Sequence, residues 1–345
     1  MHFFIFISKL KKLPAKMRKK YPLVHKFYKN YLLFPNIFFT FADGMFTKIQ
    51  SALSVRAFSV SFSELKELTK FGLSLSVVFS SVCSYILAST TIDWYGLLKL
   101  ILGGYLVVGS SNIFNQIIER DLDKLMNRTK NRPLPSGRIS VDKSLFIGFS
   151  FISIGLCLLY SLNAKAAIFS GLSSILYVFA YTPLKSVTPL SVFIGAFPGA
   201  MPAALGWVAS TNSFGVEAGF LFAFQFIWQF PHFWAVAILL HEDYKRSGFK
   251  LLPSKEKDGV VMSLIFLYTL CLIPISVFPV MDVFNSLKIS YVSATIIALS
   301  GVGFLSFSIR LIDRKDDSSA RNLMFAGLIY LPLVQLVYVI NNLMK

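Results

Sequence analysis

Four oxygen-bearing side chains recur at helical spacing near the end of one apolar stretch of this 345-residue sequence. They are Asn112, Asn115, Glu119 and Asp123, in and directly after GGYLVVGSSNIF. At roughly 100° per residue they fall within about 80° of one another on an α-helix, whereas Asp121 falls on the other side. Acids at the C-terminal end of a helix are unfavourable without nearby cations, because that end already carries partial negative charge. The spacing therefore predicts either a cation-binding site or an interfacial salt-bridge cluster that anchors the helix.

Basic side chains come directly after these acids, in DKLMNRTKNRPLPSGR. They are Arg128, Lys130, Arg132 and Arg138. Mg²⁺ prefers oxygen ligands and commonly shares its coordination sphere with substrate phosphates, and guanidinium groups bind phosphate bidentately. We therefore interpret Glu119 and Asp123 as candidate metal ligands, and Arg128 and Arg132 as candidate diphosphate ligands.

A second candidate is His232, which lies within an apolar, aromatic stretch and directly follows Pro231. Proline frees a backbone carbonyl in a helix, and an ionisable residue at membrane depth is a candidate functional residue. The aromatic neighbours are Trp228, Phe230, Phe233 and Trp234. We expect them to line a slot for a flat aromatic ligand, the alternative being ordinary helix packing.

Two further charged segments belong with these residues. Glu242 and Asp243 follow the His232 segment in HEDYKR and form a second carboxylate pair, which we interpret as additional metal ligands. Lys185 is the single charge in YTPLKSVTP, and we expect it to contact the diphosphate.

The composition decides what kind of element carries these residues. Hydrophobic residues make up 55% of the sequence and charged residues only 15%, which excludes an ordinary soluble protein. About twenty apolar residues cross a bilayer as a helix. Runs of that kind are predicted at 70–91, 94–118, 143–162, 164–182, 189–210, 217–240, 259–280, 287–309 and 322–342. The predicted fold is an all-α integral membrane protein with nine transmembrane helices.

The loops after spans 2, 4, 6 and 8 share one face if there are nine spans, and they carry most of the Lys and Arg of the spanning region. The positive-inside rule places this face on the cytoplasmic side, or on the matrix side in a mitochondrion. Most of the acids lie in the same loops, which the rule does not explain. Residues 119–138 and 241–250 are therefore predicted to meet on one face.

Residues 1–62 form a separate zone, with many Lys and Arg and a single acid, Asp43. This composition is typical of a mitochondrial transit peptide, and RAFS at 56–59 resembles a protease cleavage site. We therefore predict a transit segment at 1–62 and a membrane domain at 63–345 in the mitochondrial inner membrane. The alternative is a basic cytoplasmic arm on a bacterial plasma-membrane protein.

Several of these stretches together resemble one protein family. NQIIERDLD with LMNRTKNRPLPSG is similar to the first acidic motif, NxxxDxxxD, of the UbiA-type intramembrane prenyltransferases. Glu119 stands where most of the superfamily has Asp, and this departure resembles the branch that farnesylates heme. WQFPHFWA at 228–235, DYKRSGFKLLP at 243–253 and YTPLKSVTP with GAFPGAMPAALGW also resemble that branch. The resemblance covers about residues 65–340.

This resemblance implies nine helices around a central cavity, Mg²⁺ as cofactor, and transfer of farnesyl from farnesyl diphosphate to a vinyl group of heme B, giving heme O. The family's functional residues correspond to Asn112, Asn115, Glu119, Asp123, Arg128, Arg132 and His232. His232 would bind or orient heme. The sequence has Lys185-Ser186 where the family often has Lys-Arg, and the second acidic motif, with Glu242 and Asp243, is reduced.

Two other functions fit the same features. A relative that prenylates an aromatic quinone precursor would share the acidic motif, and a non-catalytic membrane heme carrier would use His232 as a ligand and the acids as a gate. The expected partners are the lipid bilayer, the two substrates and, among proteins, heme A synthase, with no nucleic acid.

Overall fold

A computed structural model describes residues 60–345 except residues 255, 282 and 285. Within this part of the chain nine helices are long and apolar enough to cross a membrane, and no strand occurs. The prediction of an all-α protein with nine spans is therefore confirmed. The predicted transit segment, residues 1–62, falls almost entirely outside the described residues.

The nine spans follow one another along the chain, with the longest connections after α7 and α12. They are α6 (Phe71–Ala88), α7 (Trp94–Asp123), α8 (Val141–Tyr160), α9 (Ala164–Ile175) continued by the π-helix η2 (Leu176–Tyr181) and α10 (Thr182–Leu184), α11 (Ser191–Thr211), α12 (Val216–Leu239), α14 (Gly259–Val277) continued by η3 (Phe278–Val280), α15 (Tyr291–Arg314) and α16 (Asp317–Leu343). Two short helices, α5 (Phe62–Leu68) and α13 (His241–Ser247), lie outside the spans.

Polar side chains set the starts of several spans. Ser140, Asn163 and Ser290 each accept a hydrogen bond from a backbone N–H in the first turn of the helix that follows. Asp316 caps α16 through the N–H of Ser319, so this helix begins five residues before the apolar run predicted at 322–342. Similarly, α7 continues to Asp123, beyond the predicted end at residue 118, and carries the acidic stripe as regular helix.

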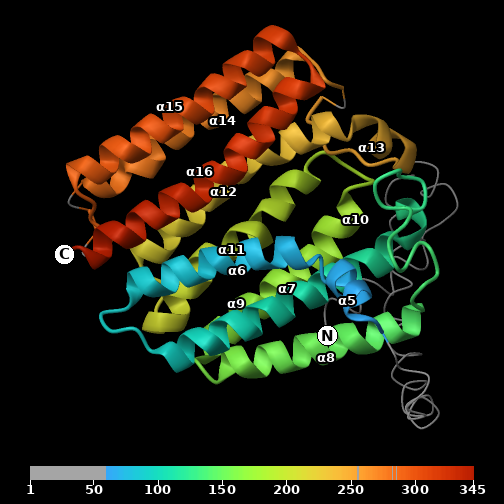
Figure 1. Cartoon of the computed structure of the whole chain (residues 1–345), viewed down its shortest axis with the longest axis horizontal. Coiled ribbons are helices and arrows are strands. Elements are labelled where there is room, and N and C mark those ends of the chain that lie inside the picture. Colours follow the sequence, from blue (N-terminus) through green and yellow to red (C-terminus); the bar gives the residue numbers. More distant parts are fainter. Residues whose placement is uncertain (1–59, 255, 282, 285) are drawn as a thin grey trace, which may run out of the picture. The chain divides into compact units, whose positions relative to one another are not determined.

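Four spans, α6, α11, α12 and α16, occupy the middle of the bundle. In Figure 1 they lie between α14 and α15 on one side and α7, α8 and α9 on the other; α6 contacts α11 and α16, and α12 contacts α11, α14 and α16. The approach of α11 to α6 requires glycine, because a Cβ on Gly206 would lie 1.9 Å from the carbonyl oxygen of Ser81. The small residues of α11 thus allow close packing against α6.

A buried polar network ties four spans together near their middle. Gln335 of α16 donates to Ser80 of α6 and Gln225 of α12, at 3.1 Å each. Gln225 in turn donates to the backbone oxygen of Gly199 in α11 at 2.8 Å. Because polar groups in an apolar interior are costly unless they are paired, these contacts fix the register of the four helices.

The loops that follow α7, α10, α12 and α15 gather at one end of the bundle, as the parity of the spans predicts. Three contacts join them: the backbone N–H of Asn127 to Asp243 at 3.1 Å, the N–H of Lys250 to the carbonyl oxygen of Lys185 at 2.7 Å, and Lys257 to Asp317 at 2.8 Å. The charged segments 119–138 and 241–250 therefore meet on the same face.

Candidate active site

The acidic stripe of α7 points into the protein. Asn112, Asn115, Glu119 and Asp123 are each at most 4% exposed. The side chain of Asp121, by contrast, is 71% exposed and pairs with Arg120 and Lys124. Helical periodicity therefore separated the buried acids from the solvated one correctly.

Each buried acid faces a cation from another part of the chain. Lys185 Nζ lies 2.5 Å from Glu119 Oε1, and Arg132 Nη1 lies 3.0 Å from Asp123 Oδ2. Burial lowers the pKa of Lys185, but the carboxylate of Glu119 raises it more, so the pKa lies above its ordinary value and the amine stays charged. Asp123 Oδ1 is buried without a hydrogen-bond partner. This oxygen is available to a further ligand.

The π-helix η2 and the short helix α10 bring two side chains to this stripe. Thr182 Oγ1 accepts a hydrogen bond from Asn115 Nδ2 at 3.1 Å, and Lys185 follows α10 directly. A π-helix shifts the side chains after it relative to a regular helix, and such segments are frequent at functional sites. Span 4 therefore carries a site at its end, although its sequence shows only one charge there.

Lys70 is a site residue that sequence reasoning missed. Its backbone adopts the left-handed conformation, with φ of 48°, between α5 and α6, and its Nζ donates to Asn115 Oδ1 at 2.9 Å. Burial and the neighbouring charges of Arg132 and Lys185 lower the pKa of Lys70 to about 7. In the sequence Lys70 stands at the predicted start of the first span, where a basic residue is ordinary. The only feature of the sequence that could have indicated this role is the position of Lys70 directly before an apolar run.

Asn112 lies on the stripe but serves the fold of the same region. Its Nδ2 donates to the backbone oxygen of Thr69 and to Ser74 Oγ, both at 3.2 Å. These bonds fix the turn between α5 and α6 that presents Lys70. Asn112 thus stabilises the backbone next to the site. Its predicted catalytic role stays a prediction.

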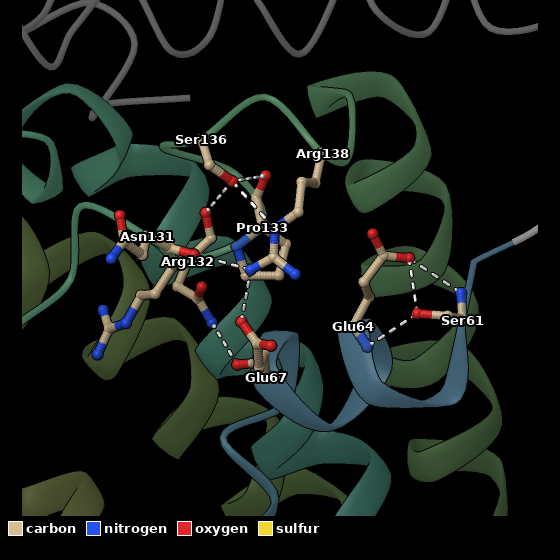
Figure 2. A network of polar contacts seen from close by, with 9 residues as sticks. Ser61, Glu64, Glu67, Asn131, Arg132, Pro133, Ser136 and Arg138 are labelled. Carbon is tan, nitrogen blue, oxygen red and sulfur yellow. Dashed lines mark hydrogen bonds and ion pairs between the residues drawn. The ribbon is translucent and has the colours of Figure 1, made fainter.

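The loop 124–140 after α7 is held at several points. The hydroxyl of Thr129 donates to the backbone oxygen of Asp123 at 2.9 Å. Figure 2 shows Arg138 between α5 and the loop, where its Nη2 donates to Glu67 Oε2 at 2.8 Å and to the backbone oxygen of Asn131 at 2.7 Å. Arg138 therefore fastens the loop to α5, whereas the Arg128 side chain is exposed at its surface.

Asp243 and Glu242 differ sharply in their surroundings. Asp243 is 9% exposed and accepts hydrogen bonds from the backbone N–H groups of Asn127 and Arg128, while Glu242 is exposed to solvent. Burial raises the pKa of Asp243, but these N–H groups and the Arg246 guanidinium lower it more, so the pKa lies below its ordinary value. Both residues stay predicted metal ligands, and the contacts of Asp243 show that it also holds the backbone of the loop after α7.

His232 belongs to α12, and its side chain lies at the interface with α16, away from the acids of α7. Its ring stacks on Trp228 with 5.0 Å between ring centroids, and its buried Nδ1 faces Gly327 without a hydrogen-bond partner. Trp228 Nε1 donates to the backbone oxygen of Gly327 at 2.9 Å. The structure thus shows no contact between His232 and the acidic stripe of α7.

The four aromatic residues around His232 do not line one slot, contrary to the expectation. Phe230 and Trp234 pack on Tyr268 of α14, with centroid distances of 4.7 and 5.3 Å. Trp228 and His232 are four residues apart and share one helix face, whereas Phe230 and Trp234 share another. The aromatic stretch therefore serves two interfaces of α12.

Among the described residues no group of three or more His, Cys, Asp or Glu could hold a metal ion by itself. The site instead combines two buried carboxylates with Asn115 and three cations, Lys70, Arg132 and Lys185. This arrangement suits a highly charged anion together with one cation that takes few protein ligands.

Comparison with known proteins agrees with this chemistry. Residues 76–329 match the UbiA prenyltransferase family. A protoheme IX farnesyltransferase of Christiangramia forsetii is 51% identical over 283 residues, covering 82% of this chain and 94% of the relative. A protein of the same name from Flavobacterium psychrophilum is 50% identical, covering 82% and 96%.

Solved structures show the same fold at low sequence identity. A structure of digeranylgeranylglyceryl phosphate synthase superimposes with a TM-score of 0.68 at 18% identity, covering 82% of this chain and 99% of that chain. A UbiA homologue from Archaeoglobus fulgidus bound to DMAPP and Mg²⁺ gives a TM-score of 0.61 at 13% identity, covering 80% and 99%. The fold of this chain is thus shared with these proteins.

Proposed function

Because this chain belongs to the UbiA prenyltransferase family, we propose that it transfers the farnesyl group of farnesyl diphosphate to a vinyl group of heme B, producing heme O, a step in heme A synthesis for cytochrome c oxidase. The observation that carries the proposal is the pairing of Glu119 with Lys185 and of Asp123 with Arg132 at one end of the bundle. The choice of substrates rests on the relatives named protoheme IX farnesyltransferase, which this chain matches over nearly their whole length.

The residues present fit a Mg²⁺ ion. Asp123 Oδ1 is a buried carboxylate oxygen without a hydrogen-bond partner, and Glu119 lies one helical turn away on the same face. Mg²⁺ usually takes one or two carboxylates and completes its shell with water and substrate phosphates, so two acids are enough. When bound, Mg²⁺ would neutralise charge on the departing diphosphate.

The protein's own cations take up the rest of that charge. Lys70, Arg132 and Lys185 lie against the acidic stripe, so a diphosphate there would gain charge-assisted hydrogen bonds that strengthen as its C–O bond breaks. The apolar interior limits access of water to the farnesyl cation. The heme vinyl group then attacks this cation, and water adds to the resulting cation with loss of a proton. The diphosphate set free by the earlier C–O cleavage is then released from the site.

The direct test is a mass assay on membranes that contain the protein. Heme B and farnesyl diphosphate should give heme O with Mg²⁺ and no product after chelation with EDTA. Formation of a prenylated product from 4-hydroxybenzoate instead would identify a quinone-pathway enzyme. Heme binding without any product would identify a heme carrier and overturn the proposal.

Lys70 gives the proposed activity a specific pH dependence. Its amine is charged below about pH 7, because its pKa is lowered to about 7, and it loses its proton above that pH. We expect the KM for farnesyl diphosphate to rise about tenfold between about pH 6 and pH 8.5 in the wild type. Lys70→Arg should flatten this dependence, because guanidinium keeps its charge, and Lys70→Met should keep a high KM throughout. An unchanged profile in Lys70→Arg would remove Lys70 from diphosphate binding.

We infer that His232 binds or orients heme through its unpartnered Nδ1. His232→Ala should weaken heme binding about tenfold or more, since an iron or propionate contact is lost, with little effect on the KM for farnesyl diphosphate. Spectroscopic titration of the purified protein with heme B measures this, and thermal unfolding checks the fold. Unchanged heme affinity would assign His232 to packing between α12 and α16.

The two relatives named above are bacterial, which supports the plasma membrane as the location. The mitochondrial inner membrane and the transit segment at 1–62 stay predictions. In either membrane the loops that bear Arg128, Lys185 and Asp243 face the cytoplasm or the matrix under the positive-inside rule. Heme A synthase, which would use the product, is the protein partner that this function predicts.

A further inference from the structure

The segment 243–250 contacts two loops: the loop after α7, which carries Arg132, and the loop after α10, which carries Lys185. On one side the Asp243 carboxylate holds the loop after α7, because Oδ1 accepts from the N–H of Asn127 at 3.1 Å and Oδ2 from the N–H of Arg128 at 3.2 Å. This loop contains Arg132, which pairs with Asp123. One carboxylate therefore fixes two consecutive peptide groups of that loop.

On the other side the same segment holds the loop after α10. The N–H of Lys250 donates to the carbonyl oxygen of Lys185 at 2.7 Å, and Lys250 Nζ reaches the carbonyl oxygen of Val187 at 3.3 Å. The ring centroid of Phe249 lies 5.3 Å from Lys185 Nζ. The segment therefore holds the backbone and flanks the side chain of the cation that pairs with Glu119.

The segment itself is closed by a tight turn. The N–H of Phe249 donates to the carbonyl oxygen of Tyr244 at 2.9 Å, and Gly248 adopts φ of 76°, which favours glycine. Arg246 forms an ion pair with Asp243. The distance between the two holding points is thus set by α13 and its C-terminal turn.

We propose that residues 243–250 form a clasp that fixes the loop of Arg132 relative to Lys185, and that Asp243 is its positioning residue. Asp243 then acts on the reaction through the backbone of Asn127 and Arg128, without touching the diphosphate. The inference rests on the proposed function only for the identity of the ligand. The clasp itself is a property of the protein without substrate.

Hydrogen exchange of the full-length protein in detergent tests the clasp directly, without heme or farnesyl diphosphate. Asp243→Ala should speed exchange of the peptide covering 124–132 about tenfold, because two backbone N–H groups lose their acceptor. Asp243→Asn should give an intermediate rate, because a single amide oxygen replaces two carboxylate oxygens. Asp121→Asn changes an exposed acid at the end of α7, directly before the same loop, and as the control it should leave the rate unchanged.

A second variant tests the turn without touching the carboxylate. Gly248→Ala adds a Cβ that meets no atom within 4 Å, so its effect comes from the positive φ alone. It should speed exchange of 124–132 and of the loop around Lys185 severalfold. Gly259→Ala also meets no atom within 4 Å and has no positive φ, so it should change neither rate.

Kinetics separate the clasp from a direct metal ligand. For a clasp, Asp243→Asn raises the KM for farnesyl diphosphate about tenfold, leaves kcat within about threefold and does not change the Mg²⁺ concentration for half-maximal activity. For a metal ligand, kcat falls and the Mg²⁺ requirement rises. Unchanged exchange of 124–132 in Asp243→Ala, or a shift in the Mg²⁺ requirement alone, would overturn the proposal. Failure to detect heme O would bear on the proposed function and leave the exchange result intact.

Discussion

Asp123→Asn is expected to lower heme O formation at least about 100-fold while heme binding survives. The substitution removes the charge on a carboxylate that is 1% exposed and whose Oδ1 has no hydrogen-bond partner. A neutral amide is a poor ligand for Mg²⁺ and leaves less charge to balance Arg132, so stabilisation of the leaving diphosphate is lost. Mass detection of heme O measures turnover, and the heme spectrum of the purified variant measures binding.

The matched control for this variant is Asp121→Asn, two residues along the same helix. The Asp121 side chain is 71% exposed and pairs with solvent-facing Arg120 and Lys124, so activity and stability should both stay near the wild-type values. Thermal unfolding of Asp123→Asn checks that loss of the Arg132 pair has not unfolded the protein. Near-normal turnover in Asp123→Asn would rule out Asp123 as a metal ligand.

Lys185→Met is expected to abolish turnover and also to destabilise the protein by about 3 kcal/mol, because it leaves the buried Glu119 carboxylate without its partner. Removing both charges should separate these effects. In the double variant Glu119→Gln/Lys185→Met no unpaired buried charge remains, so most of the stability should return. Turnover should not return, because both the proposed metal ligand and the diphosphate ligand are gone.

Unfolding midpoints and mass assays of the two single variants and the double variant complete this thermodynamic cycle. Lys165→Met is the control, since Lys165 is an exposed lysine at the other end of the bundle that donates to the backbone oxygen of Asn212. It should change neither quantity much. Recovery of turnover in the double variant would mean that the Glu119–Lys185 pair serves stability alone.

Several features of this protein could be predicted from the sequence because they depend on local periodicity. Apolar runs of about twenty residues predicted the nine spans. The spacing of Asn115, Glu119 and Asp123 predicted one buried face and left Asp121 outside it. Parity of the spans predicted that the charged loops meet at one end, which the contact of Asp243 with Asn127 confirms.

Other features depend on which residues meet across the fold, and the sequence alone did not predict them. Lys70 enters the site because a left-handed turn between α5 and α6 directs it to Asn115. Arg138 belongs to the same basic run as Arg132, yet it pairs with Glu67 of α5, whereas Arg132 pairs with Asp123. A charge in the sequence shows that a partner is needed, and only the packed helices decide which partner it finds.

The sequence by itself determined the membrane class, the number of spans, the face of α7 that holds the acids and the family of the chain, because helix periodicity, hydrophobic length and motif spacing are encoded along the backbone. The tertiary structure decided that Lys185 lies on Glu119 and Arg132 on Asp123, that His232 faces α16, and that Asp243 holds a neighbouring loop. The reason is physical: these contacts join residues from separate helices and loops, and their distances are set by how the helices pack.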